Sequence, residues 1–82
     1  MRATVLVRPK GGILDPQGEA VERSLRQLGF PVGEARVGRV IDLDVDAPSP
    51  ADARAQLEQM CERLLANPLI ESYEIELDED SS

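Results

Sequence analysis

The sequence contains no histidine and no tryptophan, and it has only one cysteine, one phenylalanine and one tyrosine. Without histidine, the Ser-His and Cys-His pairs of nucleophilic enzymes cannot form. A single cysteine allows no disulfide within the chain, which is typical of a reducing compartment. Two aromatic side chains are also too few to stack the bases of a single-stranded nucleic acid. These absences argue against a nucleophilic enzyme and against a nucleic-acid-binding protein.

Positive charge is scarce as well, because nine Lys and Arg stand against sixteen Asp and Glu, which gives a formal charge of −7. Such an acidic chain is unsuited to nucleic acid and to anionic membrane surfaces. The sequence shows no signal-peptide pattern and no apolar run near the roughly eighteen residues that a membrane span needs. We therefore expect a cytoplasmic protein that neither crosses a membrane nor is secreted.

The length of the chain predicts one small domain. The 82 residues indicate a single domain over residues 1–77, followed by an acidic tail over residues 78–82 that we expect to be disordered. A chain this short buries only a modest core, so a homodimer or a larger assembly of the chain is expected.

Three segments alternate apolar and polar residues with a period of two, the pattern of a strand with one buried face. They cover residues 2–8, the central stretch 34–46, and residues 71–77. In the central stretch Ile41, Leu43 and Val45 share one face, opposite three aspartates. Gly38 interrupts this alternation and predicts a bulge or a bend. Leu6 makes the second face of the first strand partly apolar, which indicates a strand that is central or covered on both sides.

Two helices are expected between these strands. Asp15-Pro16 and Ser49-Pro50 each place an N-cap residue before a proline at the first helical position. Each start is followed by an apolar stripe at helical spacing. The stripe of the first helix consists of Val21, Leu25 and Leu28, and that of the second of Ala53, Leu57, Met60, Cys61 and Leu64.

The predicted order of elements is β-α-β-α-β. We therefore expect an α+β fold, a two-layer sandwich in which both helices cover one face of a three-stranded, mostly antiparallel sheet. The other face of the sheet and its two edge strands would stay open. Such surfaces are natural places for self-association.

The residues predict no catalytic, cofactor or metal site. Cys61 lies on an apolar stripe, which favours packing over reactivity. Asp42, Asp44 and Asp46 could place a hard cation between two of them, but a solvated strand face is the better interpretation. Lys10 and the two glycines after it lack the spacing of a P-loop and predict a turn. We therefore expect the chain to act by binding.

Four stretches in order span most of the chain: G-I-L-D-P-Q-G at 12–18, L-G-F at 28–30, A-R-V-G-R-V-I-D-L at 35–43, and M-C-E-R-L-L-A-N-P-L-I-E-S-Y-E-I-E-L at 60–77. Together they resemble the PurS family, the small subunit of phosphoribosylformylglycinamidine (FGAM) synthase. One departure is Arg39, where the family is expected to favour lysine, so the charge is kept.

The resemblance implies a non-catalytic accessory subunit in de novo purine biosynthesis. FGAM synthase makes formylglycinamidine ribonucleotide from formylglycinamide ribonucleotide, glutamine and ATP. Its glutaminase subunit (PurQ) releases ammonia, which its synthetase subunit (PurL) consumes with ATP and magnesium. PurS would bring the two enzymes together and assist the transfer of ammonia, without binding a cofactor itself. It would be an obligatory part of a ligase complex with no catalytic site of its own, so its classification as an enzyme stays open.

The matching motifs also contain residues outside the predicted core, which we take as candidates for a partner interface. They are Asp15, Gln17, Gly18, Arg36, Gly38 and Arg39. Several have a structural interpretation as well: Asp15 as a helix cap, Gly38 as a bulge residue, and the two arginines as solvated charges at a strand edge.

Two other functions fit a small α+β domain. The first is an ACT-like regulatory module that binds a small molecule, such as an amino acid, at a dimer interface. The second is a small enzyme that works with carboxylates and arginines alone.

Overall fold

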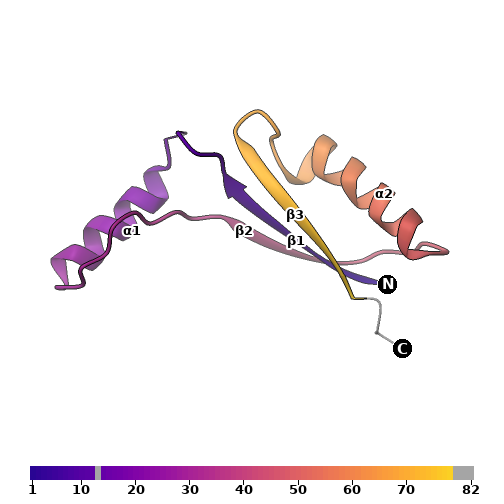
Figure 1. Ribbon diagram of the computed structural model, residues 1–82, viewed down its shortest axis with the longest axis horizontal. Helices are drawn as coiled ribbons and strands as arrows, with labels where there is room; N and C mark the ends of the chain where they lie inside the picture. Colours follow the sequence, from indigo (N-terminus) through magenta and orange to yellow (C-terminus); the bar gives the residue numbers. More distant parts are fainter. Residues whose placement is uncertain (13, 79–82) are drawn as a thin grey trace.

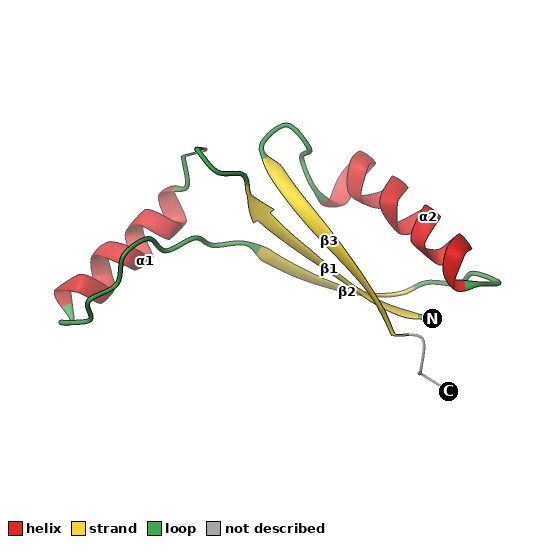
Figure 2. Ribbon diagram, in the orientation of Figure 1, coloured by secondary structure: helices red, strands yellow, loops and turns green. Residues whose placement is uncertain are grey.

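The computed structural model describes residues 1–12 and 14–78 of the chain. Its elements follow the predicted order (Figures 1 and 2). They are β1 (Arg2–Pro9), α1 (Pro16–Gln27), β2 (Arg39–Asp44), α2 (Pro50–Met60), a π-helical turn η1 (Cys61–Leu65) and β3 (Glu71–Asp78). The two helix starts are also confirmed, since the N-cap side chains of Asp15 and Ser49 accept hydrogen bonds from the backbone of the first turn.

The three strands form one antiparallel sheet in the order β2-β1-β3. The central strand is β1, one of the two arrangements that the partly apolar second face of this segment predicted. Val5 pairs with Ile41 of β2 on one side and with Ile75 of β3 on the other. These three side chains therefore lie on the same face of the sheet, and this register points the alternating apolar residues of all three strands to that face.

The core lies between this inner face and α2. Its buried residues are Ala3, Val5, Val7, Val45, Ala53, Leu57, Cys61 and Ala66. The apolar residues of the two edge strands are partly buried and pack against the core. Cys61 is fully buried, which confirms its predicted packing role, and burial raises the pKa of its thiol.

The position of α1 differs from the prediction that both helices cover one face of the sheet. Among the described residues, α1 contributes none to the core. Instead α1 lies beyond the end of the sheet, alongside residues 28–38 (Figure 1). Val21 and Leu28 of its predicted buried stripe are 43% and 74% exposed. The pattern correctly predicts a helix with an apolar side, but in this structure Val21 and Leu28 on that side are exposed and only Leu25 is half-buried.

The displaced helix makes the molecule long. Its principal extents are 50 × 29 × 14 Å, and its radius of gyration is 16.0 Å. A compact domain of this length has a radius of gyration of about 12 Å. Among the described residues, no helix has the length and apolar character needed to cross a bilayer.

Three further details differ from the sequence pattern. The ladder of β2 begins only at Arg39, although the predicted strand began at residue 34. Leu64 is 83% exposed because the wider π-helical turn shifts the helical register and rotates this residue away from the core. β3 continues to Asp78, the first residue of the predicted tail, and residues 79–82 lie outside the described part of the chain.

Candidate partner interface

The arm, which we define as α1 together with residues 28–38, is held in shape at its base by Asp15. One carboxylate oxygen of Asp15 accepts a hydrogen bond from Gly18 N at 3.1 Å, and the other accepts one from Val37 N at 3.0 Å. Arg36 Nε lies 3.8 Å from the second oxygen. The bonds from Val37 and Gly18, followed by the charge of Arg36, hold the pKa of Asp15 below its usual 3.8. Asp15 thus ties the start of α1 to the chain that returns toward β2.

Gly18 is buried at the same junction. A Cβ atom at this position would lie far inside 3.0 Å of both the Ala35 carbonyl oxygen and the Asp15 carboxylate, closer than real Cβ atoms approach. A glycine inside a helix costs about 1 kcal/mol relative to alanine. Here the cost has a structural reason, because the returning chain passes against the helix backbone.

Hydrogen bonds also join α1 to the extended segment at the far end of the arm. Arg26 donates from Nε to Val32 O at 3.1 Å and from Nη2 to Gly33 O at 3.0 Å. Phe30 N donates to Leu25 O at 3.0 Å, and Gly29 adopts a φ of 96°, the left-handed conformation that favours glycine at the end of a helix. These hydrogen bonds therefore hold α1 and residues 28–38 together as one structural unit.

The arm joins the sheet at Gly38. A Cβ atom at Gly38 would collide with the Val7 carbonyl oxygen of β1, so the close approach of two backbones requires glycine here. Next to it, Arg36 Nη2 donates to Lys10 O at 2.8 Å. A hollow of about 300 Å³ lies at this junction, and its lining includes Arg36, Gly38 and Arg39.

Arg39 holds together three elements at the start of β2. Its guanidinium forms a two-point ion pair with Glu71, with N–O distances of 2.9 and 3.2 Å, and Nη2 also donates to Leu65 O at 2.7 Å. The bond from Arg39, together with one from Asn67 N, lowers the pKa of Glu71. The planar guanidinium can make all these contacts at once, which the single ammonium of a lysine cannot do.

The structure thus gathers most of the predicted interface residues at the base of the arm. Asp15, Gly18 and Arg36 meet in one cluster, and Gly38 and Arg39 follow where β2 begins. Gln17 lies exposed in the first turn of α1. Contact of these residues with a partner stays a prediction, since the interactions described above hold the arm to the sheet.

Apolar side chains on the arm and just before it are exposed, and two of them, Val21 and Leu28, belong to the stripe that the sequence pattern assigned to the core. Leu14, Val21, Leu28 and Phe30 are 74%, 43%, 74% and 55% exposed. Exposed apolar residues gathered in one region mark an association surface more often than residues scattered singly. The helical spacing of Val21 and Leu28 was the available signal, but periodicity does not say which molecule covers an apolar side.

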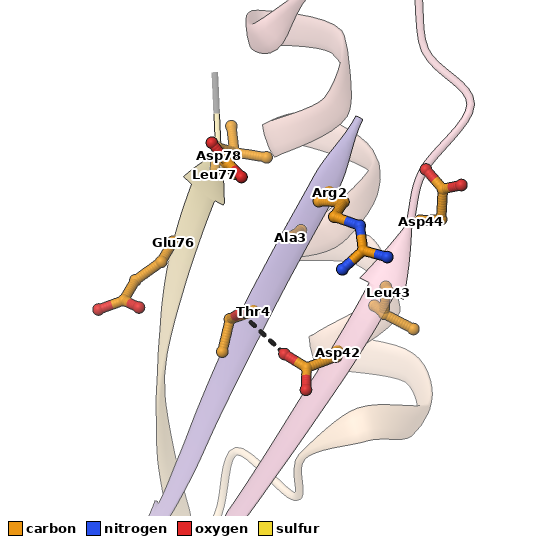
Figure 3. A pocket seen from close by; sticks show the side chains of 9 residues that line it. All are labelled: Arg2, Ala3, Thr4, Asp42, Leu43, Asp44, Glu76, Leu77 and Asp78. Atoms are coloured by element: carbon orange, nitrogen blue, oxygen red, sulfur yellow. Dashed lines mark hydrogen bonds between the residues drawn. The ribbon is translucent and has the colours of Figure 1, made fainter. Parts of the chain in front are cut away.

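The outer face of the sheet is mostly polar and charged, as the alternation predicted, with Leu6 and Val40 as an apolar pair. At the end of the sheet away from the arm it is hollowed, with Arg2, Thr4 and Asp42 beside Glu76 (Figure 3). Thr4 Oγ1 donates to Asp42 Oδ1 at 2.9 Å. Within the described part of the chain, no cluster of three or more carboxylate or cysteine side chains is arranged to hold a metal ion.

A family model described as PurS, phosphoribosylformylglycinamidine (FGAM) synthase, matches residues 2–79. The chain belongs to the PurS family. It is 46% identical over 77 residues to the PurS subunit of FGAM synthase from Synechocystis sp., and the match covers 93% of this chain and 75% of that relative. The predicted resemblance is confirmed, and the ACT-like alternative finds no support in these matches.

Solved structures of PurS proteins share the fold of this PurS-family chain. The structure of Bacillus subtilis PurS matches with a TM-score of 0.85 and 37% identity, covering 95% of this chain and 98% of that one. A chain in the structure of PurLQS from Thermotoga maritima matches with a TM-score of 0.84 and 37% identity, covering 92% of this chain and 93% of that one. The three-stranded antiparallel sheet with two helices is therefore the PurS fold.

Proposed function

We propose that this PurS-family chain is the small accessory subunit of FGAM synthase in purine biosynthesis and acts in the cytoplasm. The observation that carries the proposal is the family match over residues 2–79. A chain of the same fold in the PurLQS structure supports a role inside a complex with the other subunits.

In this complex the chain acts by its shape. Its sheet and its arm lie at opposite ends of a molecule 50 Å long. One end is a rigid β-sheet, and the other carries exposed apolar side chains. A body of this form can touch two partners at once and hold them at a set separation. We assign these partners to the synthetase subunit PurL and the glutaminase subunit PurQ.

The chemical benefit of such a spacer is controlled transfer of ammonia. Ammonia released at the glutaminase site is protonated or lost if it escapes into water, and ammonium is no nucleophile. Subunits held in register keep the path between the two sites closed to solvent. ATP and magnesium would be used by the synthetase, while this chain supplies the geometry.

The decisive experiment measures synthesis of formylglycinamidine ribonucleotide by purified PurL and PurQ with and without this chain. Glutamine is the nitrogen source in one series, and an ammonium salt replaces it in the other. We expect the chain to be required with glutamine and dispensable with ammonium. Equal rates with and without the chain in both series would refute the proposed function. A requirement for the chain in both series would instead assign it a direct role in the synthetase reaction.

A further inference from the structure

The turn between η1 and β3, residues 67–70, presents an apolar side chain to solvent. It lies at the end of the sheet where β1 ends and the arm begins (Figure 1), because Glu71 at the start of β3 pairs with Pro9. Leu69 in this turn is 83% exposed, whereas Ala66 just before the turn is buried in the core. A single exposed leucine is ordinary by itself. This one differs in how firmly the backbone around it is held.

Asn67 holds the turn from within. Its backbone oxygen accepts hydrogen bonds from Ile70 N at 3.0 Å and Glu71 N at 2.7 Å, and its Oδ1 accepts one from Leu69 N at 3.1 Å. Asn67 N donates to Glu71 Oε1 at 2.8 Å. The ring of Pro68 fixes the backbone φ angle directly before Leu69. The backbone on both sides of Leu69 is therefore restrained to one conformation.

Lys10 holds the turn from outside and brings a positive charge to it. Lys10 N donates to Ile70 O at 2.9 Å, and Lys10 Nζ donates to Pro68 O at 2.6 Å. None of the ion pairs among the described residues includes Lys10, and the residue is exposed. In a chain with a formal charge of −7, an unpaired ammonium group thus stands beside the exposed leucine.

A restrained turn with these two side chains is suited to docking on another protein. A segment that already has its bound shape avoids the free-energy cost of being ordered on binding. The anchors of protein interfaces fill pockets on the partner, and a polar rim surrounds them. Leu69 has the form of such an anchor, and Lys10 has the form of a rim charge that selects a partner of opposite charge.

The described surface of this chain does not supply the matching pocket. The apolar groove between α2 and β2 has Arg63 as its charged lining residue, and Arg63 would repel Lys10. The hollow on the outer face of the sheet carries Asp42 and Glu76, but its lining is mostly polar or charged and offers little to Leu69. The charges therefore favour a different protein over a second copy of the chain.

We propose that the 67–70 turn docks on another subunit, where Leu69 fills an apolar pocket and the Lys10 ammonium meets a carboxylate at the rim of that pocket. The inference rests on the proposed function, because PurL or PurQ supplies the pocket. It deepens that function by naming the segment of this chain that makes the contact and the chemistry of the surface that receives it.

The test measures binding of the chain to PurL, to PurQ and to their mixture by biolayer interferometry. Leu69→Glu is expected to weaken the binding by about 30-fold or more, because the anchor is lost and a carboxylate enters a pocket with an acidic rim. Ala51→Glu is the matched control, since it adds the same charge at an exposed position in the first turn of α2. This control is expected to bind like the wild type.

A second pair of variants tests the charge. Lys10→Gln keeps a donor for Pro68 O but removes the positive charge. We expect it to associate more slowly than the wild type, with an association rate that depends less on salt concentration. Arg54→Gln removes an exposed cation from α2 and is expected to leave both quantities unchanged. An unchanged salt dependence in Lys10→Gln would contradict the assigned role of Lys10.

Urea unfolding and sedimentation velocity on the same samples separate docking from folding and self-association. Leu69 lies outside the core, so Leu69→Glu is expected to keep the unfolding midpoint and the oligomeric state of the wild type. A change of oligomeric state would place the turn at a contact between copies and overturn the inference. Normal binding by Leu69→Glu would overturn it and leave the proposed function intact. A wild type that binds neither subunit nor their mixture would refute the proposed function itself.

Discussion

Replacing Gly18 by alanine tests whether the close approach of the returning chain to α1 shapes the arm. In an open helix interior this change would stabilise the protein by about 1 kcal/mol, because alanine has the higher helix propensity. In this structure the new methyl group meets the Ala35 carbonyl oxygen and the Asp15 carboxylate, each well inside 3.0 Å. The Ala35 oxygen belongs to the backbone and cannot rotate away.

The expected magnitude follows from these opposing contributions. Overpacking a closed site costs typically about 1–3 kcal/mol, occasionally more, and two contacts at Gly18 place the cost at the upper end. After the gain in helix propensity is subtracted, we expect a net loss of about 1–2 kcal/mol in the free energy of unfolding. With a slope of about 1 kcal/mol per molar urea for a chain this small, the unfolding midpoint falls by about 1–2 M.

The measurement is urea unfolding followed by circular dichroism, at one fixed protein concentration because association shifts apparent stability. Gly33→Ala is the matched control, since a Cβ atom at Gly33 has no neighbour within 4 Å. This control is expected to leave stability unchanged or raise it by up to about 1 kcal/mol. A Gly18→Ala variant as stable as the Gly33→Ala variant would refute the reasoning.

Three further predictions concern the base of the arm and the sheet. Asp15→Asn is expected to destabilise the protein at pH 7. The pKa of Asp15 is lower in the folded protein than in the unfolded chain, so its ionised form stabilises the fold above pH 3.8, and this stabilisation is lost as the pH falls through the folded-state pKa. The difference in urea midpoint between the variant and the wild type is therefore expected to narrow at pH 3. A difference that stays constant would contradict this prediction. Gly38→Val is expected to lower the free energy of unfolding by about 3 kcal/mol or more, because the new side chain collides with the backbone of β1. The variant is also expected to lose co-elution with PurL and PurQ. Normal co-elution would contradict the prediction that the junction at Gly38 is needed for assembly. The single tyrosine, Tyr73, donates to Glu62 at 2.9 Å, and this bond raises its pKa. Ultraviolet absorbance titration should show ionisation above pH 10.0, and Glu62→Gln should lower the midpoint toward that value, while an unchanged midpoint would contradict the assignment.

The strands and helix starts could be predicted because their causes are local. Alternation identified the inner face of all three strands, and an N-cap followed by proline identified both helix starts. The central position of β1 was one of the two arrangements indicated by Leu6, whose apolar side chain lies on the outer face. Each of these features depends on residues close together in the chain.

The arm could not be predicted, because its cause is long-range. The stripe of α1 shows that the helix needs an apolar partner, but it does not show whether that partner belongs to the same chain. The hydrogen bond from Val37 N to Asp15 spans 22 residues, and no local sequence pattern predicts it. Leu64 was misplaced for a different reason, since a π-helical turn changes the period on which the prediction depends.

The join between the arm and the sheet gives the molecule mechanical stiffness. The arm continues from the first residue of β2 (Figure 1), so a pull along the arm acts along that strand. Six residue pairs connect β2 to β1, and the hydrogen bonds of an antiparallel ladder lie across the strand direction. Such a pull shears all these bonds together instead of opening them one after another from an end. The arm therefore resists extension, and whatever binds at its tip keeps a fixed distance from whatever binds at the sheet.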